Sequence, residues 1–311
     1  MESNRSSLSV SVVICTYSRA ELLRQTLLSL ESVSGIAKAE VIVVDNNSPD
    51  HTSVIVAKCI ERLRGKVNLK YVFEARQGLS VARNRGIAES SGSIIAFLDD
   101  DAIPSSSWLT SVQSAFERYP DAAAIGGIIH PNFETSKPDW LVKELELGFT
   151  IVNLGDKERT YPRRLHPFGA NMAIRKEIFK ELRFPEELGR KGNSLLSGEE
   201  SWLFEEIQSQ GKKLLYIPGM SVAHFIDASR LRPEWIKRRY YYQGVSLAVW
   251  NNRLPARIRL VLFLLVKRGY LLINSLFVRS PGQRLVQECR MESIRGSVET
   301  LRSRGAIPAY E

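Results

Sequence analysis

The stretch SIIAFLDDDAIPSS, residues 93–106, decides how the rest of the sequence is interpreted. Its apolar run, residues 94–98, is typical of a strand that is buried in a sheet. Three aspartates, Asp99, Asp100 and Asp101, follow at once with no basic residue among them. Because carboxylates this close together disfavour one another's ionised form, we expect a positive partner to join them.

Aspartates two positions apart, directly after a strand, can hold a divalent cation. Mg²⁺ and Mn²⁺ prefer hard oxygen ligands, and Mg²⁺ often binds one or two carboxylates together with substrate phosphates. We therefore predict that the positive partner is Mn²⁺ or Mg²⁺ carrying a diphosphate. The structural alternative is a helix that begins at Pro104 and has the acidic residues at its N-terminus, although one aspartate would suffice for that role.

Strand-like apolar runs alternate with helix-like segments through the first 130 residues. This alternation favours an α/β fold, with a mostly parallel central sheet and helices on both faces. The strands are predicted at residues 8–15, 40–45, 68–74, 93–98 and 122–130. Ligands of such sheets bind at the carboxyl ends of the strands. One edge is therefore expected to gather residues 15–19, 45–47, 74–77 and 99–101.

The composition narrows the choice of partner. A formal net charge of +9 indicates an anionic partner or a solvated basic surface. Nucleic acid is not expected, because the basic residues are interleaved with aliphatic runs rather than gathered in a stripe.

The three cysteines, Cys15, Cys59 and Cys289, are far apart, which argues against a zinc knuckle or a disulfide scaffold and fits a reducing cytosol. The opening residues have no signal-peptide pattern.

Residues 231–311 differ in character from the rest, being aromatic, aliphatic and basic together. Residues 259–278 are about long enough to span a membrane, but Lys267 and Arg268 interrupt them near the centre. An interfacial amphipathic helix, with its cations among the lipid headgroups, fits this pattern better. The alternative is a helix that packs on the core of the α/β domain with its basic residues solvated.

Several enzyme classes are disfavoured by motif. The segment CTYSRAEL after the first strand has no glycine, so a G-x-G-x-x-G dinucleotide site is absent there. No G-x-x-x-x-G-K-[ST] phosphate loop occurs. The segment DDDAI approaches the motif of haloacid-dehalogenase-type phosphatases, but it follows the fourth predicted strand instead of the first.

Four stretches, in order, resemble those of a family 2 glycosyltransferase of the GT-A type. They are VSVVICTYSRAELLRQTLLSL, VIVVDNNSPD, ARNRGIAESSGSIIAFLDDDAIP and SGEESWLFEEIQSQGKKLLYIPGMSVAH. With GANMAIRKEIF they span residues 9 to about 225. The resemblance implies a nucleotide-sugar-binding, Rossmann-like domain at residues 1–230. Its nucleotide-binding half would be about 1–130 and its acceptor-binding half about 131–230, followed by a helical, basic C-terminal extension at 231–311.

The resemblance also implies the donor site. Asp99 and Asp101 form the D-x-D pair; Asp101 would contact the metal, and Asp99 would bind ribose or a metal-bound water. His224 would lie near the diphosphate or the metal, unless it is a structural hydrogen-bonding residue. The remaining nucleotide-sugar-binding residues would be Thr16, Tyr17, Arg19, Asp45, Arg83 and Asp100. For Asp45, capping of the following turn is the alternative.

On the acceptor side, Glu200 would be the catalytic base and Glu199 its neighbour in the motif. The family's Glu-Asp pair is Glu-Glu here, so the base is one methylene longer. Trp202 would stack on an acceptor sugar or pack in the core.

Taken together, the sequence predicts an inverting, metal-dependent glycosyltransferase. It would move a sugar from a nucleotide-diphospho-sugar to a hydroxyl of a glycan or lipid-linked acceptor. We expect it in the cytoplasm, peripheral on the inner face of the membrane. The alternative is a non-catalytic nucleotide-sugar-binding module on the same fold.

Overall fold

A computed structural model describes residues 8–163, 165–192, 194–251, 254–275, 280–303, 307–308 and 310. The chain packs into two compact units. One consists of residues 1–132, 151–186 and 200–225, and the other of residues 133–150, 187–199 and 226–311. These units follow from packing alone, and the division into functional domains at residue 230 stays a prediction.

The first unit is built on an eight-stranded sheet with the order β3-β2-β1-β4-β9-β6-β10-β8. Strands β3, β2, β1 and β4 are parallel, and β10 is parallel to β6, whereas β9 and β8 run antiparallel to their neighbours. The predicted α/β fold with a mostly parallel sheet is confirmed. The strands are β1 (Val10–Thr16), β2 (Glu40–Asp45), β3 (Asn68–Phe73), β4 (Ile94–Leu98), β6 (Ala122–Gly126), β8 (Arg159–Thr160), β9 (Asn171–Arg175) and β10 (Lys213–Tyr216).

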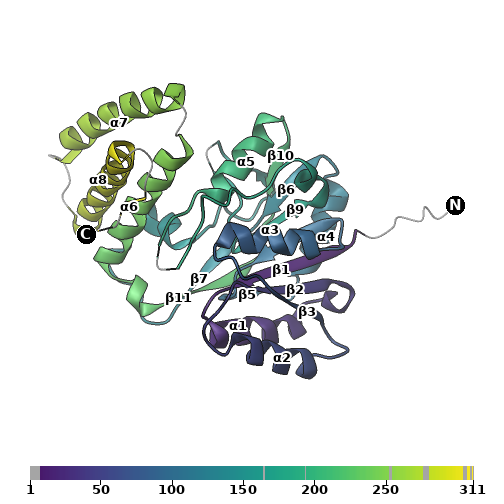
Figure 1. The fold of residues 1–311 in the computed structure, drawn as a ribbon. Helices are drawn as coiled ribbons and strands as arrows, with labels where there is room; N and C mark the ends of the chain where they lie inside the picture. Colours follow the sequence, from purple (N-terminus) through teal and green to yellow (C-terminus); the bar gives the residue numbers. More distant parts are fainter. Residues whose placement is uncertain are drawn as a thin grey trace. The chain divides into compact units, whose positions relative to one another are not determined.

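Helices flank this sheet, whose central strand β4 is apolar throughout. Every residue of β4 is buried, as expected for a strand that is covered on both faces. In Figure 1, α1 and α2 lie below strands β1–β3, and α3 lies above them. The helices are α1 (Ala20–Ser29), α2 (Thr52–Arg62), α3 (Leu79–Glu89), α4 (Trp108–Arg118) and α5 (Glu199–Ser209), with short 3₁₀ helices η1 (Leu30–Ser32), η2 (Ile36–Lys38), η3 (Lys143–Phe149), η4 (Lys176–Lys180) and η5 (Ala228–Arg230).

The structure contains a second, three-stranded sheet, and two predictions from the sequence are wrong in its region: the single strand 122–130 and the helix that begins at Pro104. This sheet has the order β5-β11-β7, with β5 (Ala102–Pro104), β11 (Val222–Ile226) and β7 (Ile129–Phe133). The predicted strand 122–130 is therefore two strands. It breaks at Gly127, where a Cβ atom would lie 1.6 Å from the Met220 carbonyl oxygen. Pro104 ends a strand and does not begin a helix, since α4 starts at Trp108, so the helix-capping alternative for the aspartates is wrong.

The second unit contains three long helices, α6 (Pro233–Trp250), α7 (Leu254–Ser275) and α8 (Pro281–Arg302). The expected helical C-terminal region is confirmed, although residues 276–278 of the predicted helix 259–278 lie outside the described residues. Helices α6 and α8 approach closely at Gly244, which has no side chain. A Cβ atom there would lie 1.8 Å from the Ser293 carbonyl oxygen. No helix among the described residues has the length and apolar character that crossing a membrane requires.

Candidate functional site

The aspartate triplet lies at the carboxyl end of β4, where it is embedded in protein contacts. Asp100 and Asp101 are buried. The Thr16 hydroxyl donates to Asp100 Oδ2 at 2.7 Å. One guanidinium nitrogen of Arg19, Nη1, lies 3.2 Å from Asp100 Oδ1 and 2.6 Å from Asp101 Oδ2. The positive partner of two of the three aspartates in this structure is therefore Arg19, which the sequence had placed only in the nucleotide pocket.

The electrostatics of this group reflect both burial and pairing. Burial raises the pKa of Asp100 to about 6, with Arg19 opposing the shift and Asp101 adding to it. Burial on its own would lower the pKa of Arg19, but the carboxylates of Asp100 and Asp101 raise it above its ordinary value. Arg19 is thus firmly cationic, and it offsets part of the negative charge at the end of β4.

A candidate metal site forms beside this ion pair. Asp99, Asp101 and His224 each offer a ligand atom, and these three atoms lie within 4.8 Å of one another. His224 is brought there by β11, which pairs antiparallel with β5 so that His224 faces Ala102. His224 Nε2 lies 3.2 Å from Asp101 Oδ1, the oxygen opposite the one that contacts Arg19.

This donor set fits a divalent cation. Two carboxylates suit Mn²⁺ or Mg²⁺, and an imidazole adds a nitrogen ligand. Asp101 and His224 are both buried, and Nδ1 of His224 has no hydrogen-bond partner among the described residues. Asp99 is partly exposed and takes part in no ion pair in the described part of the chain. A cation here would have a buried side toward His224 and an accessible side toward Asp99.

The residues predicted to hold the nucleoside differ in how they are placed. Asp45 is buried at the end of β2, where it accepts hydrogen bonds from the Ser48 backbone N–H at 2.9 Å and the Tyr71 hydroxyl at 2.8 Å. It therefore caps the following turn, and its contact with a nucleotide stays a prediction. Burial, followed by the Asp45 hydrogen bond, raises the pKa of Tyr71 to about 12. Tyr17 is exposed beside this edge of the sheet.

Asn46 was missed in the sequence interpretation. Its side chain donates to the Arg76 carbonyl oxygen at 2.7 Å and accepts from the Gly78 backbone N–H at 2.8 Å. It thereby ties the loop after β2 to the loop after β3. The signal that could have identified it is the polar pair Asn46-Asn47 directly after a buried strand.

Arg83, which is buried, and Glu200, which is half-buried, form a second ion pair. Arg83 Nη2 lies 2.8 Å from Glu200 Oε1, and the two side chains are 3% and 17% exposed. The guanidinium also lies 5.3 Å from the ring centroid of Phe184. Gly169 leaves the space for this pair, since a Cβ atom there would lie 2.0 Å from Arg83 Nη2. The structure thus brings Arg83 to the predicted catalytic base, a contact that the sequence did not suggest.

The other acceptor-side candidates, Glu199 and Trp202, lie in the first turn of α5. Glu199 is buried, and Trp202 is partly buried against the core of the first unit, as its packing alternative predicted. Stacking of Trp202 on an acceptor stays a prediction. His166 is structural: its ring nitrogens lie 2.7 Å from the Pro167 carbonyl oxygen and 2.8 Å from the Ser201 hydroxyl.

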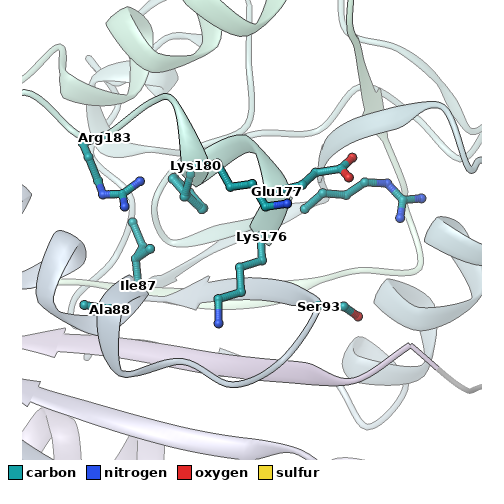
Figure 2. Close-up of a pocket in the computed structure, with 9 residues that line it drawn as sticks. Ile87, Ala88, Ser93, Lys176, Glu177, Lys180 and Arg183 are labelled. Carbon is teal, nitrogen blue, oxygen red and sulfur yellow. The ribbon is translucent and has the colours of Figure 1, made fainter.

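A pocket of about 420 Å³ lies near the opposite end of β4 (Figure 2). Ser93, which precedes that strand, lines it, together with the basic residues Arg175, Lys176, Lys180 and Arg183. Arg175 already donates to the Ala122 carbonyl oxygen, and Lys176 donates to that of Ser90. None of the predicted site residues lines this pocket. We assign it no part in the chemistry.

Comparison with known families agrees with this geometry. The sequence model of the family described as "Glycosyl transferase family 2" matches residues 11–183, a range that includes the aspartate triplet and Arg83. The chain therefore belongs to glycosyl transferase family 2 and is a glycosyltransferase.

Two named relatives match this chain over most of their length. A glucosyl-dolichyl phosphate glucuronosyltransferase from Haloferax volcanii is 28% identical over 259 residues, covering 79% of this chain and 78% of the relative. The succinoglycan biosynthesis protein ExoM from Rhizobium meliloti is 28% identical over 245 residues, covering 76% and 74%. These relatives and the family match favour an enzyme over the non-catalytic binding module that the sequence left open.

Solved structures show the same fold. The mannosyltransferase PcManGT from Pyrobaculum calidifontis, in complex with GDP-Man and Mn²⁺, superposes with a TM-score of 0.63 at 18% identity, covering 96% of this chain and 88% of that one. GalNAc-T7 with UDP, GalNAc and Mn²⁺ superposes with a TM-score of 0.57 at 18% identity, covering 80% and 51%. The predicted GT-A architecture is confirmed.

Proposed function

We propose that this glycosyltransferase is inverting and depends on a divalent cation. It transfers a sugar from a nucleoside-diphosphate sugar to a hydroxyl of a glycan or lipid-linked acceptor. The observation that carries the proposal is the cluster of Asp99, Asp101 and His224 at the carboxyl end of β4. Two solved structures of the same fold contain a nucleotide or nucleotide-sugar together with Mn²⁺, which supports such a donor.

Asp101, Asp99 and His224 would hold Mn²⁺ or Mg²⁺ with its diphosphate. Bound there, the cation supplies Lewis acidity that stabilises the negative charge on the departing diphosphate. Arg19 acts beside it, because its fixed positive charge neutralises the buried pair Asp100 and Asp101. Without that charge, these carboxylates would repel an anionic donor.

Glu200 is the proposed general base. An acceptor hydroxyl is a weak nucleophile until a carboxylate removes its proton, and such help is worth about 10²–10⁴-fold in rate. The 2.8 Å ion pair with Arg83 orients the carboxylate of Glu200. The hydroxyl attacks the anomeric carbon on the side opposite the diphosphate, so the configuration of that carbon inverts.

The lipid-linked acceptor and a peripheral place on the inner face of the membrane are also proposals. They are supported by relatives named for lipid-linked sugars: the dolichyl phosphate enzyme and a GalNAc(5)-diNAcBac-PP-undecaprenol β-1,3-glucosyltransferase from Campylobacter jejuni. The latter is 32% identical over 114 residues.

A thermal-shift panel of UDP and GDP, with and without Mn²⁺, tests the donor site. A ligand that binds the native state alone raises its melting temperature. We expect a shift for one nucleotide that is lost with EDTA and in Asp101→Asn, and that survives in Asp121→Asn, an exposed aspartate elsewhere in the first unit. Anomeric proton NMR of the product then tests inversion. A shift that is indifferent to metal, or retention of configuration, would contradict the proposal.

A further inference from the structure

Helix α7 presents an apolar surface to solvent that the glycosyl-transfer chemistry does not use. Between residues 258 and 271, where its side chains are described, the exposed apolar residues include Val266, which is 74% exposed. We call the full set the outer face of α7: Ile258, Val261, Leu262, Phe263, Leu265, Val266 and Tyr270. Seven large exposed apolar side chains on one helix are the kind of feature that marks an interaction site.

The outer face is a coherent stripe on the helix. At about 100° per residue, its seven members fall in an arc of roughly 200°. The opposite arc holds Leu260, Leu264 and Leu271, which are buried against Ala248 of α6 and Ile294 of α8. The inner stripe already completes the helical packing of this unit, so folding of the unit does not account for the outer one.

Basic side chains lie at both edges of the outer face and within it. By the same helical spacing, Arg268 lies at one edge of the arc and Lys267 at the other, while Arg259 lies within it. Arg259 and Arg268 are exposed, and Lys267 lies 5.7 Å from the Phe263 ring centroid. The surrounding sequence is one-sided in charge. Residues 235–287 contain ten lysines and arginines and no aspartate or glutamate.

We infer that the outer face of α7 docks on an anionic lipid surface. Apolar side chains at the centre of the stripe would enter the acyl boundary, and the flanking cations would pair with headgroup phosphates. The excess of positive charge around the stripe favours an anionic lipid surface over a second copy of the chain. Two copies would bring like charges together along both edges of the stripe. The inference concerns a partner of the proposed enzyme, but it does not require the proposed chemistry to be correct.

Sedimentation with vesicles of phosphatidylcholine, with and without phosphatidylglycerol, tests the inference on the full chain without any sugar donor. Wild-type protein should bind the anionic vesicles, and more weakly at high salt. The variant Leu262→Ser, Leu265→Ser, Val266→Ser should bind at least about tenfold more weakly. Reversing Arg259 and Arg268 to Glu should weaken binding by at least about fivefold per charge.

Matched controls lie on the first unit. Val54→Ser removes an exposed apolar side chain from α2, and Arg62→Glu reverses an exposed charge on the same helix. Both should bind vesicles as the wild type does. Equal vesicle binding by the α7 variants and the wild type would overturn the inference. So would a wild-type dimer in lipid-free buffer that the α7 variants convert to monomer while vesicle binding is absent.

A single-site probe covers the case in which the triple variant does not fold. Val266→Cys changes one highly exposed residue, whereas Cys59 and Cys289 are buried and Cys15 is only partly exposed, so a polarity-sensitive dye can be directed to position 266. Its emission should shift to the blue on anionic vesicles, whereas the same dye at Val54→Cys should not respond. If the protein sedimented with vesicles but the emission of the dye at position 266 did not shift, another surface would make the contact and the inference would be wrong. Glycosyl transfer to a water-soluble acceptor, measured separately, reports on the proposed function alone.

Discussion

Replacing Gly169 by alanine should disable catalysis while leaving the fold intact. An added Cβ atom would lie 2.0 Å from Arg83 Nη2 and 2.3 Å from Glu200 Oε1, whereas ordinary contacts of such an atom begin at 3.4 Å. Each group must therefore retreat by more than 1 Å. Both are the ends of flexible side chains, and Gly169 is not among the residues with a positive φ, so the backbone can accept alanine without strain.

The expected effect falls on turnover. A displacement of about 1 Å in a catalytic group can cost about 10²-fold in rate, so kcat should fall by about that factor. The KM for the donor should change little, and the cost in unfolding free energy should stay within about 1–3 kcal/mol. Release of nucleoside diphosphate in a coupled assay gives kcat and KM, and urea unfolding gives the stability.

Gly269→Ala is the matched control, because the same methyl group would have nothing within 4 Å on α7. It should leave kcat unchanged and, as a helix-interior glycine replaced by alanine, stabilise the protein by about 0.5–1 kcal/mol. If folded Gly169→Ala protein kept a kcat within about threefold of the wild type, the ion pair of Arg83 and Glu200 would not position the catalytic base as we argue.

Three further predictions follow from other parts of the structure. Glu200→Gln should lower kcat by about 10²–10⁴-fold while nucleotide binding persists in calorimetry. The control Glu205→Gln, on the same helix, should leave kcat unchanged. Equal kcat values for the two variants would show that Glu200 is not the general base. Gly244→Ala should lower the unfolding free energy in urea by about 2 kcal/mol or more, because the methyl group meets the backbone of α8; an unchanged midpoint would contradict this close crossing. Burial raises the pKa of the Cys15 and Cys289 thiols to about 12, so little thiolate exists at about pH 8, and Ellman's reagent should react slowly with native protein and fast in urea.

The buried strands and the edge that carries the site were predictable from local sequence. Strand β4 is apolar at every position, and Asp99 follows it directly, so the pattern placed the aspartates at the carboxyl end of a central strand. The aromatic, aliphatic and basic composition of residues 231–311 also indicated the helical C-terminal region. Such features depend on the order of neighbouring side chains, and that order is written in the sequence itself.

The partners of the charged residues were not predictable in the same way. Arg19 and Asp101 are 82 positions apart, and Arg83 and Glu200 are 117 apart, so no local pattern relates them. The break of the predicted strand 122–130 likewise depends on the Met220 carbonyl oxygen, which crowds Gly127 from a distant part of the chain.

By itself, the sequence determined the α/β alternation, the position of the acidic triplet and the resemblance to the family that the comparisons confirm. The tertiary structure alone decided that Arg19 neutralises Asp100 and Asp101, that β11 brings His224 to Asp101, and that Arg83 holds Glu200. The physical reason is that strand and helix formation respond to short-range periodicity, whereas ion pairing in a buried site requires side chains that only the packed sheet brings within 3 to 4 Å.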